Sequence, residues 1–94
     1  MADQEWHGVH PVPFRDGYQR LGWRVPSGRT RRVRVREHTC ECMSVIYEFC
    51  QAGGLMFIQR VVRAEGGEER HETARLPCAE AKLLWDLLLD GRAG

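Results

Sequence analysis

The sequence predicts an α+β fold in which an antiparallel β-meander of four to five strands is followed by one C-terminal α-helix. Strand-like segments occupy much of residues 18–76, turns containing glycine separate them, and the hydrophobic period becomes that of a helix after Leu76. A chain of 94 residues suits one domain rather than two. We therefore expect an N-terminal arm at residues 1–14 and a single domain at 15–94, with the sheet at about 18–76 and the helix at about 77–90.

The N-terminal part of the chain predicts an arm and then a strand. Residues 1–14 follow neither a helical nor a strand period, and Trp6 and Phe14 are the expected anchors of this arm. Residues 18–25 are expected to form the first strand. The PSGR stretch at residues 26–29 has the composition of a turn.

The second strand begins near Arg31 and carries alternating valine and arginine. In the stretch RRVRVRE, Val33 and Val35 alternate with arginines, which predicts a half-buried strand with an arginine-lined outer face. A straight continuation would carry Glu37 and Glu41 onto the apolar face. We therefore expect a bend or short loop at residues 38–42, with strands on either side.

The rest of the sheet follows from alternation and turn residues. Apolar residues alternate from Met43 to Phe49, and QAGG at residues 51–54 is typical of a tight hairpin. The run LMFIQRVV predicts a strand with both faces partly apolar, and EGGE at residues 65–68 predicts the next turn. The polar stretch RHETARL then predicts an edge strand.

The segment PCAEAKLLWDLLLDG predicts a helix with an unusually wide apolar surface. Pro77 suits the first helical turn, Glu80 suits the positive N-terminal end, and Gly91 suits a left-handed C-terminal cap. A surface wider than one sheet can cover predicts a second partner, which we expect to be another copy of the chain. The expected homodimer contact consists of Leu83, Leu84, Trp85, Leu87 and Leu88.

Composition indicates a soluble, cytoplasmic protein with no membrane partner. The chain is 43% hydrophobic and 29% charged, and it has no apolar run of about 20 residues and no secretory leader pattern. Thirteen of its fourteen basic residues are arginine, which is typical of a GC-rich, bacterial genome. Residues 1–36 carry a net charge of +5 and residues 37–94 a net charge of −4, so the two parts are expected to attract each other or different partners.

Three of the four cysteines lie in the stretch VREHTCECMSVIYEFC. The zinc ligand set that this stretch offers is His38, Cys40, Cys42 and Cys50. In extended chain, however, Cys40 and Cys42 would lie about 7 Å apart, and structural zinc sites usually use a longer spacing between cysteines. We expect no metal and no other cofactor, with free thiols in a reducing compartment, and we keep the zinc site as an alternative.

Nothing in the sequence indicates an enzyme. The glycine pairs lack the lysine of a phosphate-binding loop and join strand to strand, and Ser27 and Ser44 lack a nucleophile-elbow context. Histidines and carboxylates are present without a pattern that fixes their geometry.

The stretch RTRRVRVR offers an alternative function. Its guanidinium groups match the phosphates of a nucleic acid, whereas the glutamates of residues 65–72 offer competing cross-strand partners. The order of elements, together with LPCAEAKLLWDLL at residues 76–88, resembles positive-cofactor-four and whirly-type single-stranded DNA binders, and this resemblance implies the same alternative. The residues expected to contact nucleic acid are Arg29, Arg31, Arg32, Arg34 and Arg36.

Our leading hypothesis is a small, non-enzymatic regulatory or adaptor protein that acts as a homodimer and contacts an unidentified protein partner. A nucleic-acid-binding regulator and a zinc-binding module are the alternatives.

Overall fold

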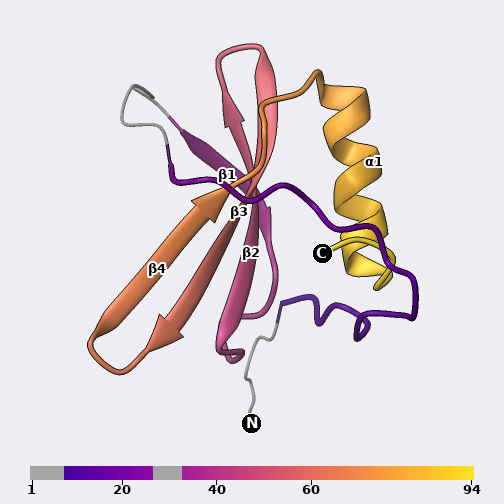
Figure 1. The fold of residues 1–94 in the computed structure, drawn as a ribbon. Helices are drawn as coiled ribbons and strands as arrows, with labels where there is room; N and C mark the ends of the chain where they lie inside the picture. Colours follow the sequence, from indigo (N-terminus) through magenta and orange to yellow (C-terminus); the bar gives the residue numbers. More distant parts are fainter. Residues whose placement is uncertain (1–7, 27–32) are drawn as a thin grey trace, which may run out of the picture.

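The computed structural model describes residues 8–26 and 33–94, which form one sheet and one helix (Figure 1). The strand order is β1-β2-β3-β4, and all neighbouring strands are antiparallel. The predicted α+β fold, a meander followed by a C-terminal helix, is confirmed. The elements are β1 (Arg34–His38), β2 (Val45–Ala52), β3 (Leu55–Ala64), β4 (Gly67–Glu72) and α1 (Cys78–Leu89).

The β2–β3 hairpin forms the centre of the sheet. The two strands pair without interruption from Val45 and Val62 to Ala52 and Leu55. Gly53 in the connecting turn has φ of 62°, a conformation that favours glycine. Because side chains alternate between the two faces of a strand, one face of the hairpin carries a continuous apolar surface toward α1. Its buried members are Tyr47, Phe49, Met56 and Ile58.

Helix α1 covers this face of the sheet. Ala81, Trp85 and Leu88 are its buried residues, and the rings of Phe49 and Trp85 stack with centroids 5.4 Å apart. Pro77 precedes the first helical residue, as the sequence predicts. Beyond the helix, Gly91 has φ of 77° and its amide donates to the carbonyl of Leu88.

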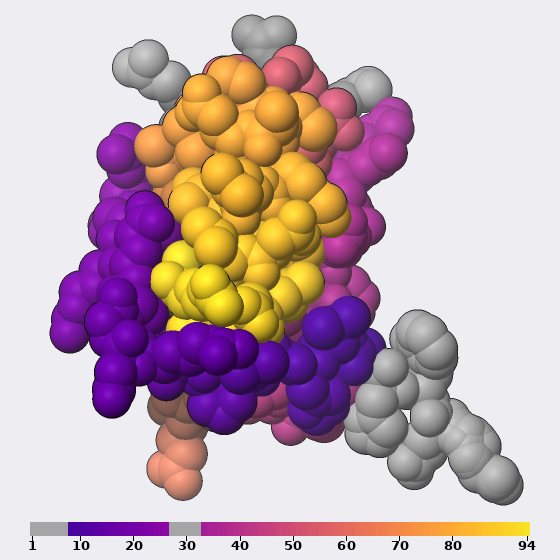
Figure 2. Space-filling model, turned by 90° about the vertical axis from the view of Figure 1, so that its right-hand side faces the viewer, coloured from indigo at the N-terminus to yellow at the C-terminus, as the bar shows by residue number. Residues whose placement is uncertain are grey.

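Residues 8–26 pass around the C-terminal end of α1, where they cover the last turn of the helix and the tail that follows it (Figure 2). The amides of Val12 and Gln19 donate to the carbonyls of Leu89 and Arg92, both at 2.8 Å. Gly91 is required at this crossing, because a Cβ there would lie 2.4 Å from the carbonyl oxygen of Pro13. The N-terminal segment therefore supplies part of the cover that the wide apolar helix needs.

The strand predicted at residues 18–25 is wrong. Among the described residues this segment makes only isolated bridges, between Gln19 and Ala93 and between Arg24 and Glu72. Leu21 is buried and Trp23 packs against the core, so alternate residues do point inward as in a strand. The segment pairs mainly with the C-terminal tail, a contact that a local pattern does not reveal.

Strand β1 is an exposed edge rather than a half-buried strand. All of its residues are exposed, and Val33 and Val35 are 41% and 47% exposed, in contrast to the prediction that they lie inside. The pairing with β2 shifts between Val35 and Glu37, which places Glu37 opposite Phe49. This irregularity breaks the two-residue alternation that the sequence predicts for the arginines.

The sheet face opposite α1 also carries buried apolar residues. Cys50 pairs with Phe57 and Ile46 with Val61 in the β2–β3 ladder, and all four are buried. The guanidinium of Arg75 lies over the Phe57 ring, 4.7 Å from its centroid. Both faces of the hairpin are therefore apolar, as the run LMFIQRVV predicts.

Candidate metal centre

The expected bend between β1 and β2 is a tight turn at Cys40–Met43. Thr39, which is fully buried, fixes the start of the turn through two hydrogen bonds with β2: its backbone amide donates to the carbonyl of Tyr47, and its side-chain Oγ1 accepts from the amide of Tyr47, both at 2.9 Å. The amide of Met43 donates to the carbonyl of Cys40 at 3.4 Å. The chain between Cys40 and Cys42 is therefore folded back rather than extended.

The N-terminal arm crosses this turn at close range. The amide of Cys40 donates to the carbonyl of Val9 at 2.8 Å, and Val9 forms a parallel bridge with Thr39. Gly8 makes the approach feasible, because a Cβ there would lie only 3.2 Å from the Cα of Cys40. This docking brings His10, the residue after Val9 in the arm, beside the two cysteines.

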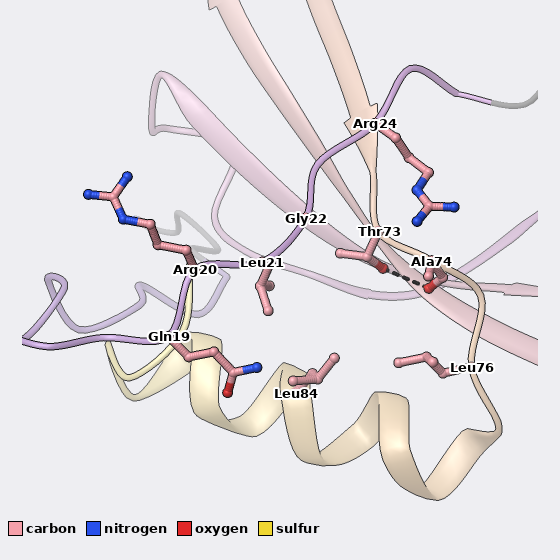
Figure 3. A pocket seen from close by; sticks show the side chains of 9 residues that line it. All are labelled: Gln19, Arg20, Leu21, Gly22, Arg24, Thr73, Ala74, Leu76 and Leu84. Atoms are coloured by element: carbon pink, nitrogen blue, oxygen red, sulfur yellow. Dashed lines mark hydrogen bonds between the residues drawn. The ribbon is translucent and has the colours of Figure 1, made fainter.

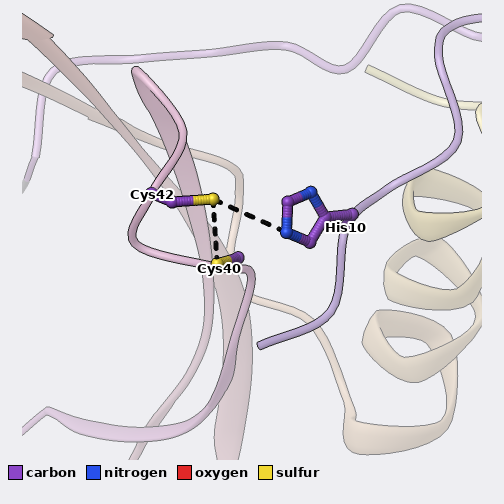
Figure 4. A group of neighbouring side chains, drawn as sticks. All are labelled: His10, Cys40 and Cys42. Atoms are coloured by element: carbon purple, nitrogen blue, oxygen red, sulfur yellow. Dashed lines mark hydrogen bonds between the residues drawn. The ribbon is translucent and has the colours of Figure 1, made fainter. Parts of the chain in front are cut away.

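Three potential metal ligands converge where the arm meets the turn (Figure 4). The sulfur atoms of Cys40 and Cys42 lie 3.1 Å apart, and the Sγ of Cys42 lies 3.5 Å from Nε2 of His10. The three ligand atoms all lie within 4.8 Å of one another. We call these residues the His10–Cys40–Cys42 cluster.

The spacing of the cluster is close to that required by a single ion. Zn–S bonds of about 2.3 Å and Zn–N bonds of about 2.0 Å place the ligand atoms of a tetrahedral zinc ion roughly 3.5–3.8 Å apart. The Sγ of Cys42 and Nε2 of His10 are already 3.5 Å apart, and the two sulfur atoms need to move apart by less than about 1 Å. The ligand atoms of Cys40 and His10 lie within 4.8 Å of each other, so this pair needs to approach by at most about 1.3 Å. The two sulfur atoms do not have the separation of about 7 Å that extended chain would give them, so the distance expected to disfavour a zinc site is absent.

The two thiols have different surroundings. Cys40 is buried and Cys42 is exposed. The hydrogen bond from Cys40 raises the pKa of the Cys42 thiol above its usual value, and partial desolvation and the charge of Cys40 act in the same direction. The Cys42 thiol therefore holds its proton more tightly than a free thiol, and an ion that binds the thiolate must displace this proton.

His38 and Cys50 do not belong to the cluster, in contrast to the ligand set offered by the sequence. Nδ1 of His38 lies 2.8 Å from the carbonyl oxygen of Thr39. Cys50 is fully buried in the sheet, and burial raises the pKa of its thiol to about 12, which disfavours the thiolate that a metal requires. His10 is the third member of the cluster instead. The only feature of the sequence that pointed to His10 is its position in an N-terminal arm that was expected to pack against the domain.

An open apolar groove adjoins the cluster. It has a volume of about 390 Å³, and its walls come from the residues that follow His10 in the arm and those that follow Cys42 in the turn and β2. The groove and the cluster are therefore formed by the same two segments, the N-terminal arm and the chain from the turn into β2. Its lining residues are Pro11, Val12, Pro13, Phe14, Met43, Val45 and Tyr47.

A second pocket lies between residues 19–24, residues 73–76 and α1 (Figure 3). Leu21, Leu76 and Leu84 contribute apolar walls, and its volume is about 210 Å³. No cysteine, histidine or carboxylate lines it. The hydroxyl of Thr73 already donates to the carbonyl of Ala74 and accepts from the amide of Ile58. This pocket supplies no group for acid–base or nucleophilic chemistry.

The residues predicted for a dimer contact divide between the core and the surface. Trp85 and Leu88 are buried within the protomer, Leu84 and Leu87 are partly buried, and Leu83 is 61% exposed. Leu83 is therefore the most exposed member of the set. A homodimer through α1 stays a prediction.

The predicted arginine row is described only in part. Arg34 and Arg36 are exposed on β1, whereas Arg29, Arg31 and Arg32 lie outside the described residues. The cross-strand pairing expected between Arg34 or Arg36 and the glutamates of residues 65–72 is wrong, because β1 pairs with β2 while β4 forms the other edge of the sheet.

Comparison of the chain with protein-family models, curated proteins and solved structures finds no match. Among the described residues there is no helix with the length and apolar character needed to cross a bilayer.

Proposed function

We propose that this chain is a non-enzymatic metal-binding protein that holds a zinc ion through His10, Cys40 and Cys42. The observation that supports the proposal is the convergence of two sulfur atoms and an imidazole nitrogen within 4.8 Å. Thiolate and imidazole ligands favour zinc, whereas magnesium and calcium prefer oxygen ligands. The site lies at the surface, because His10 and Cys42 are exposed.

The proposed ion joins two segments that are distant in sequence. His10 and Cys42 are separated by 32 positions, and the backbone bond between Cys40 and Val9 already draws their segments together. A metal bond adds a second connection at the same crossing. Zinc binding is therefore coupled to docking of the arm on the sheet.

Three ligands leave one position of a tetrahedral ion for a further donor. Water, a buffer component or another side chain can fill this position. His7 is the histidine nearest to His10 in sequence, and it lies outside the described residues. Replacement of His7 by alanine tests whether the chain itself provides the fourth donor.

Equilibrium zinc binding to the reduced protein, in competition with a chromogenic chelator, tests the proposed function. We expect one zinc ion per chain and a loss of affinity of at least about tenfold in Cys42→Ser and in His10→Ala. Cys78→Ser and His38→Ala are the matched controls, because Cys78 is an exposed thiol and His38 an exposed imidazole outside the cluster. Equal zinc affinity in wild type and in Cys42→Ser would contradict the proposal.

Nucleic-acid binding is a second candidate, and the exposure of β1 supports it. Arg34 and Arg36 lie on an edge strand whose five residues are all exposed, and the glutamate-bearing β4 is not its neighbour. Guanidinium groups at an exposed edge are accessible to phosphates.

A further inference from the structure

The geometry of the His10–Cys40–Cys42 cluster points to a second property, which rests on the proposed zinc site. We infer that Cys40 and Cys42 are a redox-active thiol pair, and that their oxidation by peroxide to an intramolecular disulfide prevents metal binding. The site would then bind zinc when reduced and release it when oxidised.

The separation of the two sulfur atoms carries this inference. They lie 3.1 Å apart, whereas a disulfide bond is about 2.05 Å long, so the atoms need to approach by only about 1 Å. The turn at Cys40–Met43 already directs both side chains to the same place. A cysteine pair in extended chain would require a rearrangement of the backbone to reach this distance.

Unequal exposure assigns a different step to each cysteine. Cys42 is exposed and meets hydrogen peroxide first, whereas Cys40 is only 3% exposed and lies within reach of Cys42. Cys42 attacks one peroxide oxygen, the O–O bond breaks, and a sulfenic acid and one water form. The sulfur of Cys40 then attacks the sulfenic sulfur, an S–S bond forms, and a second water leaves.

The reaction balances in both states of the site. Two thiols and one hydrogen peroxide give one disulfide and two waters, with two electrons passing from the sulfur atoms to the peroxide. When zinc is bound, two thiolates, one hydrogen peroxide and two protons give the disulfide, two waters and free Zn²⁺. The disulfide retains no thiolate, so His10 alone remains of the three described ligands.

The other two cysteines act as internal references. Cys50 is fully buried in the β2–β3 ladder. Cys78 is exposed at the start of α1, and it is not a member of the cluster. Oxidation controlled by exposure alone would modify Cys78 as readily as Cys42, whereas oxidation controlled by proximity selects the pair.

Peptide mapping after peroxide treatment identifies the bond directly. The full-length protein, reduced and then freed of reductant, is treated with one equivalent of hydrogen peroxide in metal-free and zinc-loaded forms. The remaining thiols are alkylated, and the unfolded chain is cleaved after glutamate. Cleavage at Glu37, Glu41 and Glu48 separates Cys40, Cys42 and Cys50 onto different peptides, so Cys40 and Cys42 stay together only through a disulfide.

We expect loss of two of the four thiols, linkage of peptides 38–41 and 42–48, and release of one zinc ion per chain. Dithiothreitol should restore the thiols and zinc binding. Cys78→Ser should behave like wild type. Cys42→Ser should give no linkage of peptides 38–41 and 42–48, and Cys40→Ser should accumulate a sulfenic acid that dimedone traps.

Two results would overturn the inference: oxidation of Cys42 to sulfinic acid without linkage to Cys40, or a disulfide between chains through Cys78. The metal-free sample separates this inference from the proposed zinc site. Linked peptides from a protein that binds no zinc when reduced would support the thiol pair and refute the proposed metal function.

Discussion

The indole Nε1 of Trp85 donates a hydrogen bond of 3.0 Å to Oε1 of Glu37, a residue 48 positions earlier in the chain. Nζ of Lys82 lies 3.5 Å from the other oxygen of the same carboxylate. Because Trp85 is the largest fully buried side chain among the described residues, its N–H group needs an acceptor. The register shift in β1 thus places the carboxylate of Glu37 next to the buried indole N–H group of Trp85.

Replacement of Glu37 by alanine should reduce the free energy of unfolding by about 1–3 kcal/mol, because the buried indole N–H loses its acceptor. Glu37→Gln should cost less, since the amide oxygen can still accept. Urea denaturation at neutral pH measures both changes. Glu41→Ala is the control, because the side chain of Glu41 is exposed in the turn. A similar loss in both alanine variants would refute a specific role for the Trp85–Glu37 bond.

Zinc should stabilise the folded protein. At a free zinc concentration 100 times the dissociation constant, the free energy of unfolding should rise by about 2.7 kcal/mol if the unfolded chain does not bind the ion. The increase should disappear in His10→Ala and persist in His38→Ala. Thermal denaturation of the reduced protein with and without zinc provides the measurement. Stabilisation that survives in His10→Ala would place the ion elsewhere.

Alkaline pH should weaken the fold through Cys50. Burial raises the pKa of this thiol from 9.0 to about 12, so the folded state holds its proton more tightly than the unfolded state. The contribution of Cys50 to the free energy of unfolding is fully present below pH 9. It is lost as the pH rises toward about 12, at up to about 1.4 kcal/mol per pH unit.

Urea denaturation between pH 8 and roughly pH 11 measures this slope, and Cys50→Ala should reduce it by the contribution of one proton. The prediction fails if the slope of Cys50→Ala equals that of wild type.

The homodimer predicted from α1 can now be tested at a single exposed position. If the helix forms the contact, Leu83→Glu should convert a dimer into a folded monomer, because Leu83 is 61% exposed and outside the core cluster. Trp85→Ala should instead destabilise the protomer by about 3–5 kcal/mol. Sedimentation equilibrium and circular dichroism separate these effects. Wild-type protein that is monomeric at micromolar concentration would remove the dimer.

Any nucleic-acid binding by β1 should depend on salt. For a single-stranded oligonucleotide, each phosphate neutralised contributes about −0.7 to the slope of log affinity against log salt. The double variant Arg34→Gln, Arg36→Gln should therefore reduce the magnitude of the slope by about 1.4 while the fold is retained. Fluorescence anisotropy over a range of salt concentrations tests this. An unchanged slope would exclude these two residues as phosphate contacts.

Local pattern was sufficient to predict the hairpin and the helix, because the residues that form them are neighbours in sequence. Alternation from Val45 to Phe49 and the period change after Leu76 each follow from nearby residues. Local pattern gave a wrong prediction for residues 18–25. Leu21 and Trp23 point inward alternately, as in a strand, but this segment pairs with the C-terminal tail at Ala93 instead of joining the sheet as a strand.

The sequence predicted free thiols and offered a zinc site only as an alternative, and that alternative contained only two of the three residues of the candidate metal centre. Cys40 and Cys42 belonged to the zinc ligand set that the sequence offered, and the expected bend between the strands is present. The sequence did not predict how sharply this turn brings the two sulfur atoms together. His10 was missed because it reaches the cysteines through docking of the arm, which depends on the Val9–Cys40 hydrogen bond and on the small size of Gly8.

The contact between the N-terminal segment and the tail also constrains how the chain folds during synthesis. Nε1 of Trp23 donates to the carbonyl of Gly94, 71 residues later, and the amide of Gly94 donates to the carbonyl of Gln19. At about 5–20 residues per second, a ribosome needs roughly 4–14 s to add the intervening residues. During this interval the segment has no tail to bind. The bonds of Trp23 and Gln19 to Gly94 can therefore form only after residue 94 has been translated.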